Sequence, residues 1–235
     1  MAAPYFYFPS IVKQVETFVL DENSSRHIVQ VLRMQPGEEL HLTDGKGLSA
    51  RATIEAADKK RCTVRISEKQ MQPPPKRRVQ IGLSLLKNAS RFEWFLEKAT
   101  ELGISEIIPL KCTRTEKQQF RMDRMKGILE SALIQSRQVW IPVIQEPQLF
   151  AEWIASVQTD QKFIAHCENG TKRRLSEMIN TNLSSQLILI GPEGDFTVDE
   201  INLAIESHFI EVELGDNRLR SETAAVAAAA VLKLI

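Results

Sequence analysis

The chain lacks the features that mark several large classes of protein. Its three cysteines, Cys62, Cys112 and Cys167, lie far apart and form no C-x-x-C pair, which argues against a disulfide framework and a zinc cluster. The longest apolar run, residues 224–232, is far shorter than the roughly 20 residues that span a bilayer. The N-terminus has no basic-then-apolar signal pattern. These absences predict a cytoplasmic protein that has no membrane-spanning segment and binds no metal.

The chain has no net charge, because 30 Lys and Arg residues balance 30 Asp and Glu residues. The net charge therefore indicates no binding partner, but the charged residues are unevenly distributed along the sequence. Residues 111–137 contain seven basic and three acidic groups, whereas residues 138–235 contain seven basic and fourteen acidic ones. A basic segment can bind a polyanion or can simply form a solvated surface, and charge alone leaves the two interpretations equal.

Residues 1–72 have the pattern of a small β-domain. One helix interrupts the strands, and it is expected over residues 24–33 with Ser24 as its N-cap. Asp44-Gly45 predicts a hairpin turn. Strands are expected at residues 5–8, 17–20, 40–43, 48–56 and 62–67. Several short strands with a single helix favour a small barrel.

A run of three prolines, residues 73–75, marks the domain boundary, because proline continues neither a helix nor a central strand. Strands then alternate with helices, which predicts an α/β domain whose mostly parallel sheet is covered on both faces. Ser90 and Glu93, like Thr197 and Glu200, have capping-box spacing. Strands are expected at 79–85, 104–110, 163–166, 187–190 and 210–214, and helices at 90–102, 121–138, 150–157, 175–179, from 197 onward and at 224–234.

Two loops carry the unusual chemistry of this second domain. Residues 191–196, Gly-Pro-Glu-Gly-Asp-Phe, follow one buried strand, and residues 215–220, Gly-Asp-Asn-Arg-Leu-Arg, follow the next. Neither loop is a dinucleotide or P-loop fingerprint. Taken singly, the first is a tight turn and the second a surface ion-pair cluster. Two such loops after strands of one sheet favour a shared ligand pocket.

An ordered set of motifs along nearly the whole chain resembles the ribosomal RNA small-subunit uracil-N3 methyltransferase family, within the knotted SPOUT superfamily. The motifs are His27 with Val31-Leu32-Arg33 and Pro36-Gly37, Lys98 to Gly103, Gln135-Ser136, Ile190 to Gly194, and Leu214-Gly215 with Arg218 to Ala224. The sequence departs from the family pattern in having no arginine before Arg26, in carrying Asp195 where a third glycine is common, and in Arg137 after Gln135-Ser136.

The resemblance implies a PUA-like β-barrel for RNA recognition over residues 1–72 and a SPOUT domain with a deep trefoil knot over residues 73–235. It implies S-adenosylmethionine as the cofactor and N3 of a uridine in 16S ribosomal RNA, or in the small ribosomal subunit, as the methyl acceptor. It also implies a homodimer whose active site forms at the subunit interface. The cofactor-binding residues would be Leu189, Ile190, Gly191, Pro192, Glu193, Gly194, Leu214, Gly215, Asn217, Arg218, Leu219 and Arg220.

Roles for individual side chains follow from the chemistry of the reaction. Arg220 is expected to stabilise negative charge on a uracil that loses its N3 proton. Glu222 is a candidate catalytic base, with an N-cap or ion-pair role as the alternative. Candidates for RNA contact are His27, Arg33, Lys87, Arg114 and Arg137, although a core or helix-capping role is favoured for His27.

Two other functions fit the same residues. One is a non-catalytic RNA-binding factor in ribosome assembly that keeps the fold. The other is a knotted methyltransferase that acts on transfer RNA.

Overall fold

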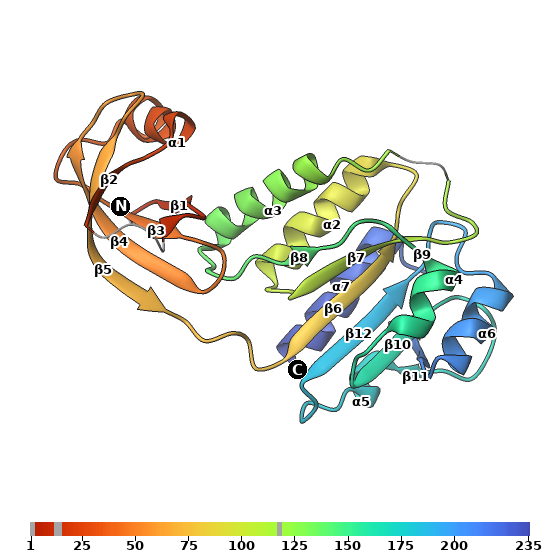
Figure 1. The fold of residues 1–235 in the computed structure, drawn as a ribbon. Helices are drawn as coiled ribbons and strands as arrows, with labels where there is room; N and C mark the ends of the chain where they lie inside the picture. The colour runs from red at the N-terminus through yellow and green to blue at the C-terminus, as the bar shows by residue number, and fades with distance from the viewer. Residues whose placement is uncertain (1–2, 12–15, 117–118) are drawn as a thin grey trace. The chain divides into compact units, whose positions relative to one another are not determined.

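The computed structural model describes residues 3–11, 16–116 and 119–235 (Figure 1). The chain folds into two compact units. The first consists of residues 1–74 and 133–141, and the second of residues 75–132 and 142–235. The chain therefore contributes to the first unit twice.

The first unit is built on a five-stranded sheet in the order β1-β3-β4-β5-β2. Its neighbouring strands are antiparallel except for β1 and β3, which are parallel. The bounds are β1 (Tyr5–Tyr7), β2 (Thr17–Val19), β3 (Glu39–Thr43), β4 (Leu48–Ala56) and β5 (Thr63–Met71). All five expected strands are present, and β5 extends four residues beyond the predicted end at residue 67.

The core of this unit lies on one face of the sheet. Alternate residues of β4, from Leu48 to Ile54, are buried, which is the period of two expected for a half-buried strand. Phe8, just after β1, stacks on Phe18 of β2 with ring centroids 4.9 Å apart. Because β1 and β2 are the two edge strands, this contact requires the sheet to curl strongly.

The helix of the first unit starts earlier than the sequence predicted. Asp21, not Ser24, is the N-cap of α1 (Glu22–Arg26), and its carboxylate accepts a 3.0 Å hydrogen bond from the Ser24 amide. Asp is as good an N-cap as Ser, and the expectation of Ser24 rested on the first apolar residue of the periodic pattern. A π-helical turn, η2 (His27–Val31), continues the helix.

The β3–β4 hairpin is confirmed, and a late segment of the chain packs on it. The Asp44 carboxylate accepts hydrogen bonds from the amides of Lys46 (2.7 Å) and Leu48 (3.0 Å). The Gly47 amide donates to the carbonyl of Val139 at 2.8 Å. A Cβ on Gly47 would meet the ring of Trp140, so glycine at this position admits the indole. Residues 139–141 thus complete the small unit from a distant part of the sequence.

The second unit contains an eight-stranded sheet in the order β11-β13-β10-β12-β6-β7-β8, with β9 also paired to β7. Each pair of neighbouring strands described in it is parallel, as predicted. The bounds are β6 (Arg78–Ser84), β7 (Glu106–Lys111), β8 (Val143–Ile144), β9 (Gln148–Leu149), β10 (Gln161–Ala165), β11 (Arg173–Arg174), β12 (Ser185–Ile190) and β13 (Ile210–Glu213). The sequence did not predict the two-residue strands β8, β9 and β11.

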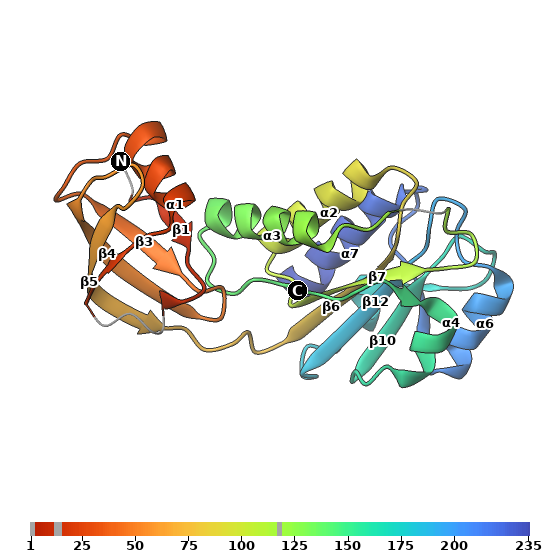
Figure 2. The same ribbon diagram turned by 45° about the horizontal axis from the view of Figure 1, so that its top comes forward.

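Helices lie on both faces of this sheet (Figures 1 and 2). α7 packs on α2 and on strands β6 and β12, whereas α4 and α6 pack together on the other face. The bounds are α2 (Ala89–Glu101), α3 (Met122–Ser136), α4 (Phe150–Trp153) followed by η3 (Ile154–Ser156), α5 (Leu175–Met178), α6 (Val198–Glu206) and α7 (Ser221–Leu234). Within the described ranges, no helix is both long enough and apolar enough to cross a membrane.

The two faces of the central strand β12 have different cores. Leu187 and Leu189 lie in a cluster with Phe150 of α4 and Ile201 of α6. On the opposite face, the small side chains of α7 allow it to approach the sheet and α2 closely, and Ala225, Ala228 and Ala229 are fully buried there.

Three helix starts test the predicted caps. The Thr197–Glu200 capping box is present at the start of α6, as predicted. The Ser90–Glu93 box is not: Asn88 caps α2 by accepting from the Ser90 amide at 2.9 Å. The Glu93 carboxylate instead binds Arg124 of α3, at 2.6 Å in one of its two contacts. α7 begins at Ser221 rather than at 224, which places Glu222 in its first turn.

Candidate functional site

Three loops of the second unit meet at one edge of the sheet. Strands β10, β12 and β13 are parallel neighbours, with Ala165 opposite Ile190 and also opposite Val212, so the loops that follow them leave at the same level. We call residues 191–196 the first loop, residues 215–220 the second loop and residues 166–172 the third loop. Together they surround a cavity of about 710 Å³.

The cavity unites most of the residues expected to bind a cofactor. Of these, Leu189 and Gly194 do not line it, and neither does Glu222, the candidate catalytic base. Leu189 is fully buried in the core on the α4–α6 face of the sheet. The expected residues that do line the cavity are Ile190, Gly191, Pro192, Glu193, Leu214, Gly215, Asn217, Arg218, Leu219 and Arg220.

The first loop is held by its surroundings on several sides. Gly191 is buried, and a Cβ there would lie 3.0 Å from the backbone nitrogen of Phe196, so the loop folds tightly on itself. The Asp195 amide donates to the Pro192 carbonyl at 2.9 Å, which closes a turn. The Arg114 guanidinium donates to the carbonyls of Gly194 (2.7 Å) and Phe196 (3.3 Å). Arg114 therefore supports the backbone of this loop.

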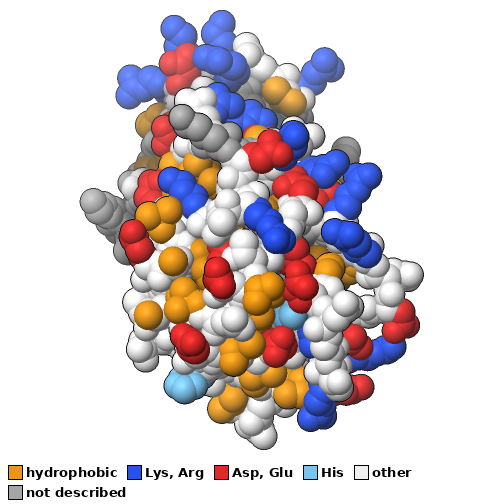
Figure 3. Space-filling model, turned by 90° about the vertical axis from the view of Figure 1, so that its right-hand side faces the viewer, with side chains coloured by type: hydrophobic (Ala, Val, Ile, Leu, Met, Phe, Trp, Pro, Cys, Tyr) orange, Lys and Arg blue, Asp and Glu red, His pale blue; other side chains and the backbone are white. Residues whose placement is uncertain are grey.

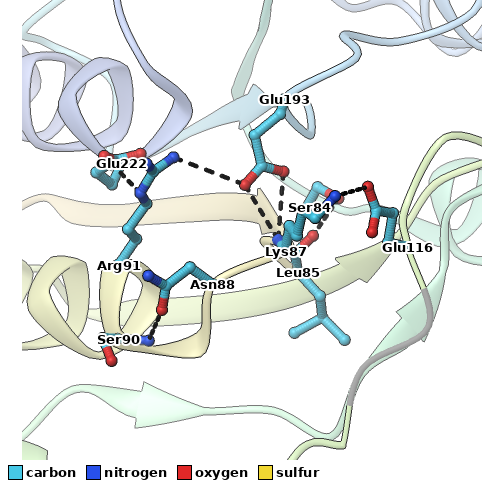
Figure 4. Close-up of polar contacts among 9 residues, drawn as sticks. All are labelled: Ser84, Leu85, Lys87, Asn88, Ser90, Arg91, Glu116, Glu193 and Glu222. Atoms are coloured by element: carbon cyan, nitrogen blue, oxygen red, sulfur yellow. Dashed lines mark hydrogen bonds and ion pairs between the residues drawn. The ribbon is translucent and has the colours of Figure 1, made fainter.

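Lys87, just before α2, and Arg91, in its first turn, join the first loop to α7 (Figure 4). The Lys87 amide donates to both carboxylate oxygens of Glu193, at 3.0 and 3.3 Å. Arg91 lies between two carboxylates, with Nη1 4.0 Å from Glu193 Oε1 and Nε 3.6 Å from Glu222 Oε1. The Lys87 ammonium pairs with Glu116 at 3.1 Å. One helix start thus contacts both the first loop and the beginning of α7.

Glu222 stands behind the cavity. Its side chain is only 10% exposed, one oxygen faces Arg91, and the other, Oε2, is buried without a hydrogen-bond partner among the described residues. A carboxylate in the first turn of a helix is also stabilised by the helix dipole. This environment matches the ion-pair alternative for Glu222, and Glu222 is not among the residues that line the cavity.

The second loop has far fewer contacts with its surroundings. Its residues are exposed, and Gly215 has a φ of +146°, a conformation that side chains rarely adopt. Asp216 pairs with Arg174 of β11 at 2.9 Å. Neither Arg218 nor Arg220 makes an ion pair with any residue that the structure describes, and both line the cavity. Two cationic side chains are therefore available to a ligand.

The third loop was missed by the sequence analysis, although a strand at 163–166 was expected. Its lining residues His166, Cys167 and Lys172 form no recognisable motif, but the rule that places loops after parallel strands at one edge applies to it equally. His166 is 2% exposed and its Nε2 lies 2.9 Å from Glu211 Oε1. The Lys172 ammonium donates to the carbonyls of His166 (2.8 Å) and Glu168 (2.6 Å), which orders the loop.

The cysteine of the third loop is not an activated nucleophile. Partial burial raises the pKa of the Cys167 thiol, and the nearby Asp195 carboxylate raises it further. Burial raises the pKa of Cys112 to about 12. A thiol with a raised pKa holds its proton at neutral pH. Among the described residues, no group of three or more His, Cys, Asp or Glu side chains is arranged to hold a metal ion.

The candidates for RNA contact fall into two groups. Lys87 and Arg114 are exposed and lie beside the first loop of the cavity. His27, Arg33 and Arg137 belong to the first unit, and each is exposed. His27 is exposed and is the C-cap residue of α1, with its ring edge-on to Phe6 at 5.8 Å, so it lies at the end of a helix and not in the core.

The face of the molecule in Figure 3 carries side chains of both charges. Lys and Arg side chains gather toward the top of this view, and Asp and Glu side chains are spread among apolar ones over the rest.

Two family models match the chain. The model of the RNA methyltransferase domain matches residues 72–233, and the model of the RNA methyltransferase PUA domain matches residues 20–67.

Similar proteins match over most of their length. Ribosomal RNA small subunit methyltransferase E of Synechocystis is 31% identical over 93% of this chain and 73% of the relative, and that of Mycobacterium bovis is 29% identical over 97% and 90%. The crystal structure of ribosomal RNA small subunit methyltransferase E from Neisseria gonorrhoeae bound to S-adenosyl methionine has 28% identity, a TM-score of 0.89, and coverage of 99% of this chain and 98% of that one.

Proposed function

The chain belongs to the family of RNA methyltransferases that includes ribosomal RNA small subunit methyltransferase E, and from that premise we propose that it methylates N3 of a uridine in 16S ribosomal RNA with S-adenosylmethionine as the methyl donor. The observation that carries the proposal is the convergence of the first and second loops on one cavity, where Arg218 and Arg220 have no ion-pair partner among the described residues.

The cavity suits this donor in size and in chemistry. Its volume of about 710 Å³ lies within the range of pockets for drug-sized ligands. Apolar side chains such as Ile190, Val212 and Leu214 offer a surface for a purine base, and Glu193 and Asp216 offer negative charge to a sulfonium and an ammonium group. When bound, the donor supplies an electrophilic methyl group. Gly191 leaves no room for a Cβ beside Phe196, so the first loop keeps the tight fold that forms this wall of the cavity.

The protein's part in the reaction is to position the acceptor and to stabilise charge. A uracil reacts at N3 only after that nitrogen loses its proton, and the ring then carries negative charge. Arg220, exposed at the cavity, is placed to stabilise that charge. Glu222 holds Arg91 rather than the base of the substrate, so we assign it to the ion pair and assign no residue as the general base.

RNA recognition is proposed for the N-terminal domain. N3 lies on the Watson–Crick edge, so the target uridine must be unpaired or flipped out, and specificity then comes from RNA shape. We propose that residues 1–72 form a PUA-like barrel that binds RNA through His27 and Arg33. Residues 73–235 would form the methyltransferase domain with a trefoil knot, and Lys87, Arg114 and Arg137 would add contacts with phosphates.

Two further features belong to the proposal. The active protein is a homodimer with the site at the subunit interface, which light scattering of the purified protein would detect as twice the chain mass. The activity is cytoplasmic, because its substrate is ribosomal RNA.

The test supplies the purified protein with S-adenosylmethionine and one of three acceptors: free 16S ribosomal RNA, small ribosomal subunits, or transfer RNA. Digested RNA is analysed by nucleoside mass spectrometry. 3-Methyluridine in ribosomal RNA alone supports the proposal. Methylation of transfer RNA alone identifies the second class of enzyme. Tight RNA binding with neither donor binding nor methyl transfer identifies a non-catalytic assembly factor, and either of these results overturns the proposal.

A further inference from the structure

Asp195 has the left-handed backbone conformation that glycine adopts most easily, with a φ of +64°. It is the last residue of the turn that starts at Pro192. Residues other than Gly, Asn and Asp rarely adopt this left-handed conformation. The backbone therefore limits the choice of residue, but it does not require a carboxylate.

The carboxylate joins two of the three loops around the cavity. Its Oδ2 accepts a 2.7 Å hydrogen bond from the amide of Cys167 in the third loop. Its Oδ1 accepts a 2.8 Å bond from the amide of Phe196 in the first loop. Hydrogen bonds from backbone amides to a charged oxygen are stronger than those between neutral groups. Asp195 thus connects the segments that follow the neighbouring strands β10 and β12.

The other contacts that order the third loop are made within the loop itself or with strand β13. Lys172 donates to carbonyls of the same loop, and His166 is held by Glu211 of β13. All the hydrogen bonds described between the third loop and the first join Cys167 to Asp195, and the best defined is the one from the Cys167 amide. Both residues line the cavity, so this bond sets the separation of two of its walls.

We propose that Asp195 is a positioning residue whose carboxylate holds the third loop against the first loop and so pre-shapes the cavity for S-adenosylmethionine. The proposal rests on the function proposed above for the cavity. Without the bridge, the third loop samples other positions, and the cofactor binds only the fraction of molecules with the walls in place. Affinity for the cofactor then falls, whereas the chemical step of the bound complex does not change.

Two substitutions of Asp195 distinguish the effect of its hydrogen bond to Cys167 from the effect of its negative charge. Asp195→Gly removes the carboxylate and relieves the backbone, so it loses the bridge without adding strain. Asp195→Asn also tolerates the positive φ and loses the charge, but its single amide oxygen can keep only one of the two bonds that the carboxylate accepts from the amides of Cys167 and Phe196. Asp199→Asn is the matched control, because Asp199 is an exposed acidic residue in the first turn of α6 and does not line the cavity.

Cofactor binding is measured by titration calorimetry, and turnover with ribosomal RNA by methyl transfer. We expect Asp195→Gly to weaken the affinity about tenfold and to raise the KM for the cofactor with kcat nearly unchanged. Asp195→Asn should lose less affinity, about threefold, where its oxygen still accepts from Cys167 while its NH2 group faces the Phe196 amide. Equal losses of affinity in the two variants, with the Cys167 amide still protected from exchange in Asp195→Asn, would mean that the charge acts directly on the cofactor. No loss in either variant would mean that the bridge is irrelevant, and both results overturn the proposal.

A second measurement needs no cofactor. Hydrogen exchange of the Cys167 amide in the free protein should become at least about tenfold faster in Asp195→Gly, should be accelerated less in Asp195→Asn, and should not change in Asp199→Asn. Unchanged protection in Asp195→Gly would show that no bridge exists. If the parent chain does not bind S-adenosylmethionine, the proposed function fails and the shaping of a cofactor site fails with it, whereas the exchange result still decides whether the bridge is present.

Discussion

The first and second loops contribute to the same cavity but are built in opposite ways. The first loop is held by the amide of Lys87, the guanidinium of Arg114 and a close packing of Gly191 on Phe196. The second loop is exposed along its length, and an ion pair between Asp216 and Arg174 is its one salt bridge among the described residues.

The difference separates two tasks within one site. A loop with many fixed contacts presents its backbone in a single conformation, which suits the recognition of a cofactor of constant shape. A loop with exposed arginines keeps its charged groups available for a substrate that arrives later. We therefore expect changes in the first loop to act mainly on cofactor affinity and changes in the second loop to act mainly on turnover.

Replacing Arg220 with alanine should give the largest effect. The rate of methyl transfer should fall about 10²-fold or more, as it does when a charge-stabilising donor is removed from an active site, with little change in cofactor affinity. Single-turnover transfer and calorimetry measure the two quantities separately. Arg173→Ala is the control, since Arg173 is an exposed arginine of β11 that does not line the cavity. A large loss of cofactor affinity in Arg220→Ala would contradict the inference that the second loop acts mainly on turnover.

Gly191→Ala should affect the first loop. The new Cβ would lie 3.0 Å from the Phe196 nitrogen and 3.1 Å from its ring, and the backbone cannot move aside easily. We expect cofactor affinity to fall about tenfold, together with about 1–3 kcal/mol of stability from overpacking. Thermal unfolding with and without cofactor measures both effects.

Gly127→Ala is the matched control for that substitution. Gly127 lies within α3, and a Cβ there would meet nothing within 4 Å. Alanine should raise the stability by about 0.5–1 kcal/mol through helix propensity and leave the cofactor affinity unchanged. Equal behaviour of the two variants would contradict the close packing at Gly191.

Arg114→Ala tests whether the Arg114 guanidinium supports the first loop or binds an RNA phosphate. Loss of its bonds to the Gly194 and Phe196 carbonyls should loosen the first loop and weaken cofactor binding about fivefold. If Arg114 instead binds a phosphate, cofactor affinity will not change and the salt dependence of RNA binding will fall by about one charge. The two assays together assign the residue.

The smallest expected effect concerns Cys167. Its raised pKa leaves little thiolate at pH 7, so alkylation by iodoacetamide should be slow and should accelerate as the pH rises. Asp195→Asn removes a negative neighbour, which lowers the thiol pKa and should speed alkylation at pH 7 about two- to threefold. Mass spectrometry of the labelled peptide reports the rate. Cys112 is buried with a pKa of about 12 and provides an unreactive internal reference.

Regular, periodic elements were predictable from the sequence. The longer strands of both sheets and the long helices carry a clear apolar period, and parallel strands are enough to bring the first and second loops to the same edge of the sheet. The third loop was missed because His166, Cys167 and Lys172 have no motif and obtain their places from tertiary contacts. The caps at Ser24 and Ser90 were wrong because Asp21 and Asn88, a few residues upstream, are equally good N-caps, and local sequence does not decide between them.

The first unit is formed by two separate segments of the chain, and this affects how it can fold during synthesis on the ribosome. Trp140 donates from its indole nitrogen to the carbonyl of Pro73 at 3.1 Å, and Val139 and Ile141 bond to the hairpin at Gly47 and Gly45. These partners emerge about 60 residues after Pro74, which at about 5–20 residues per second is a wait of several seconds. Throughout that interval the nascent β3–β4 hairpin lacks these contacts, and the place that Trp140 fills beside Gly47 stays open to solvent.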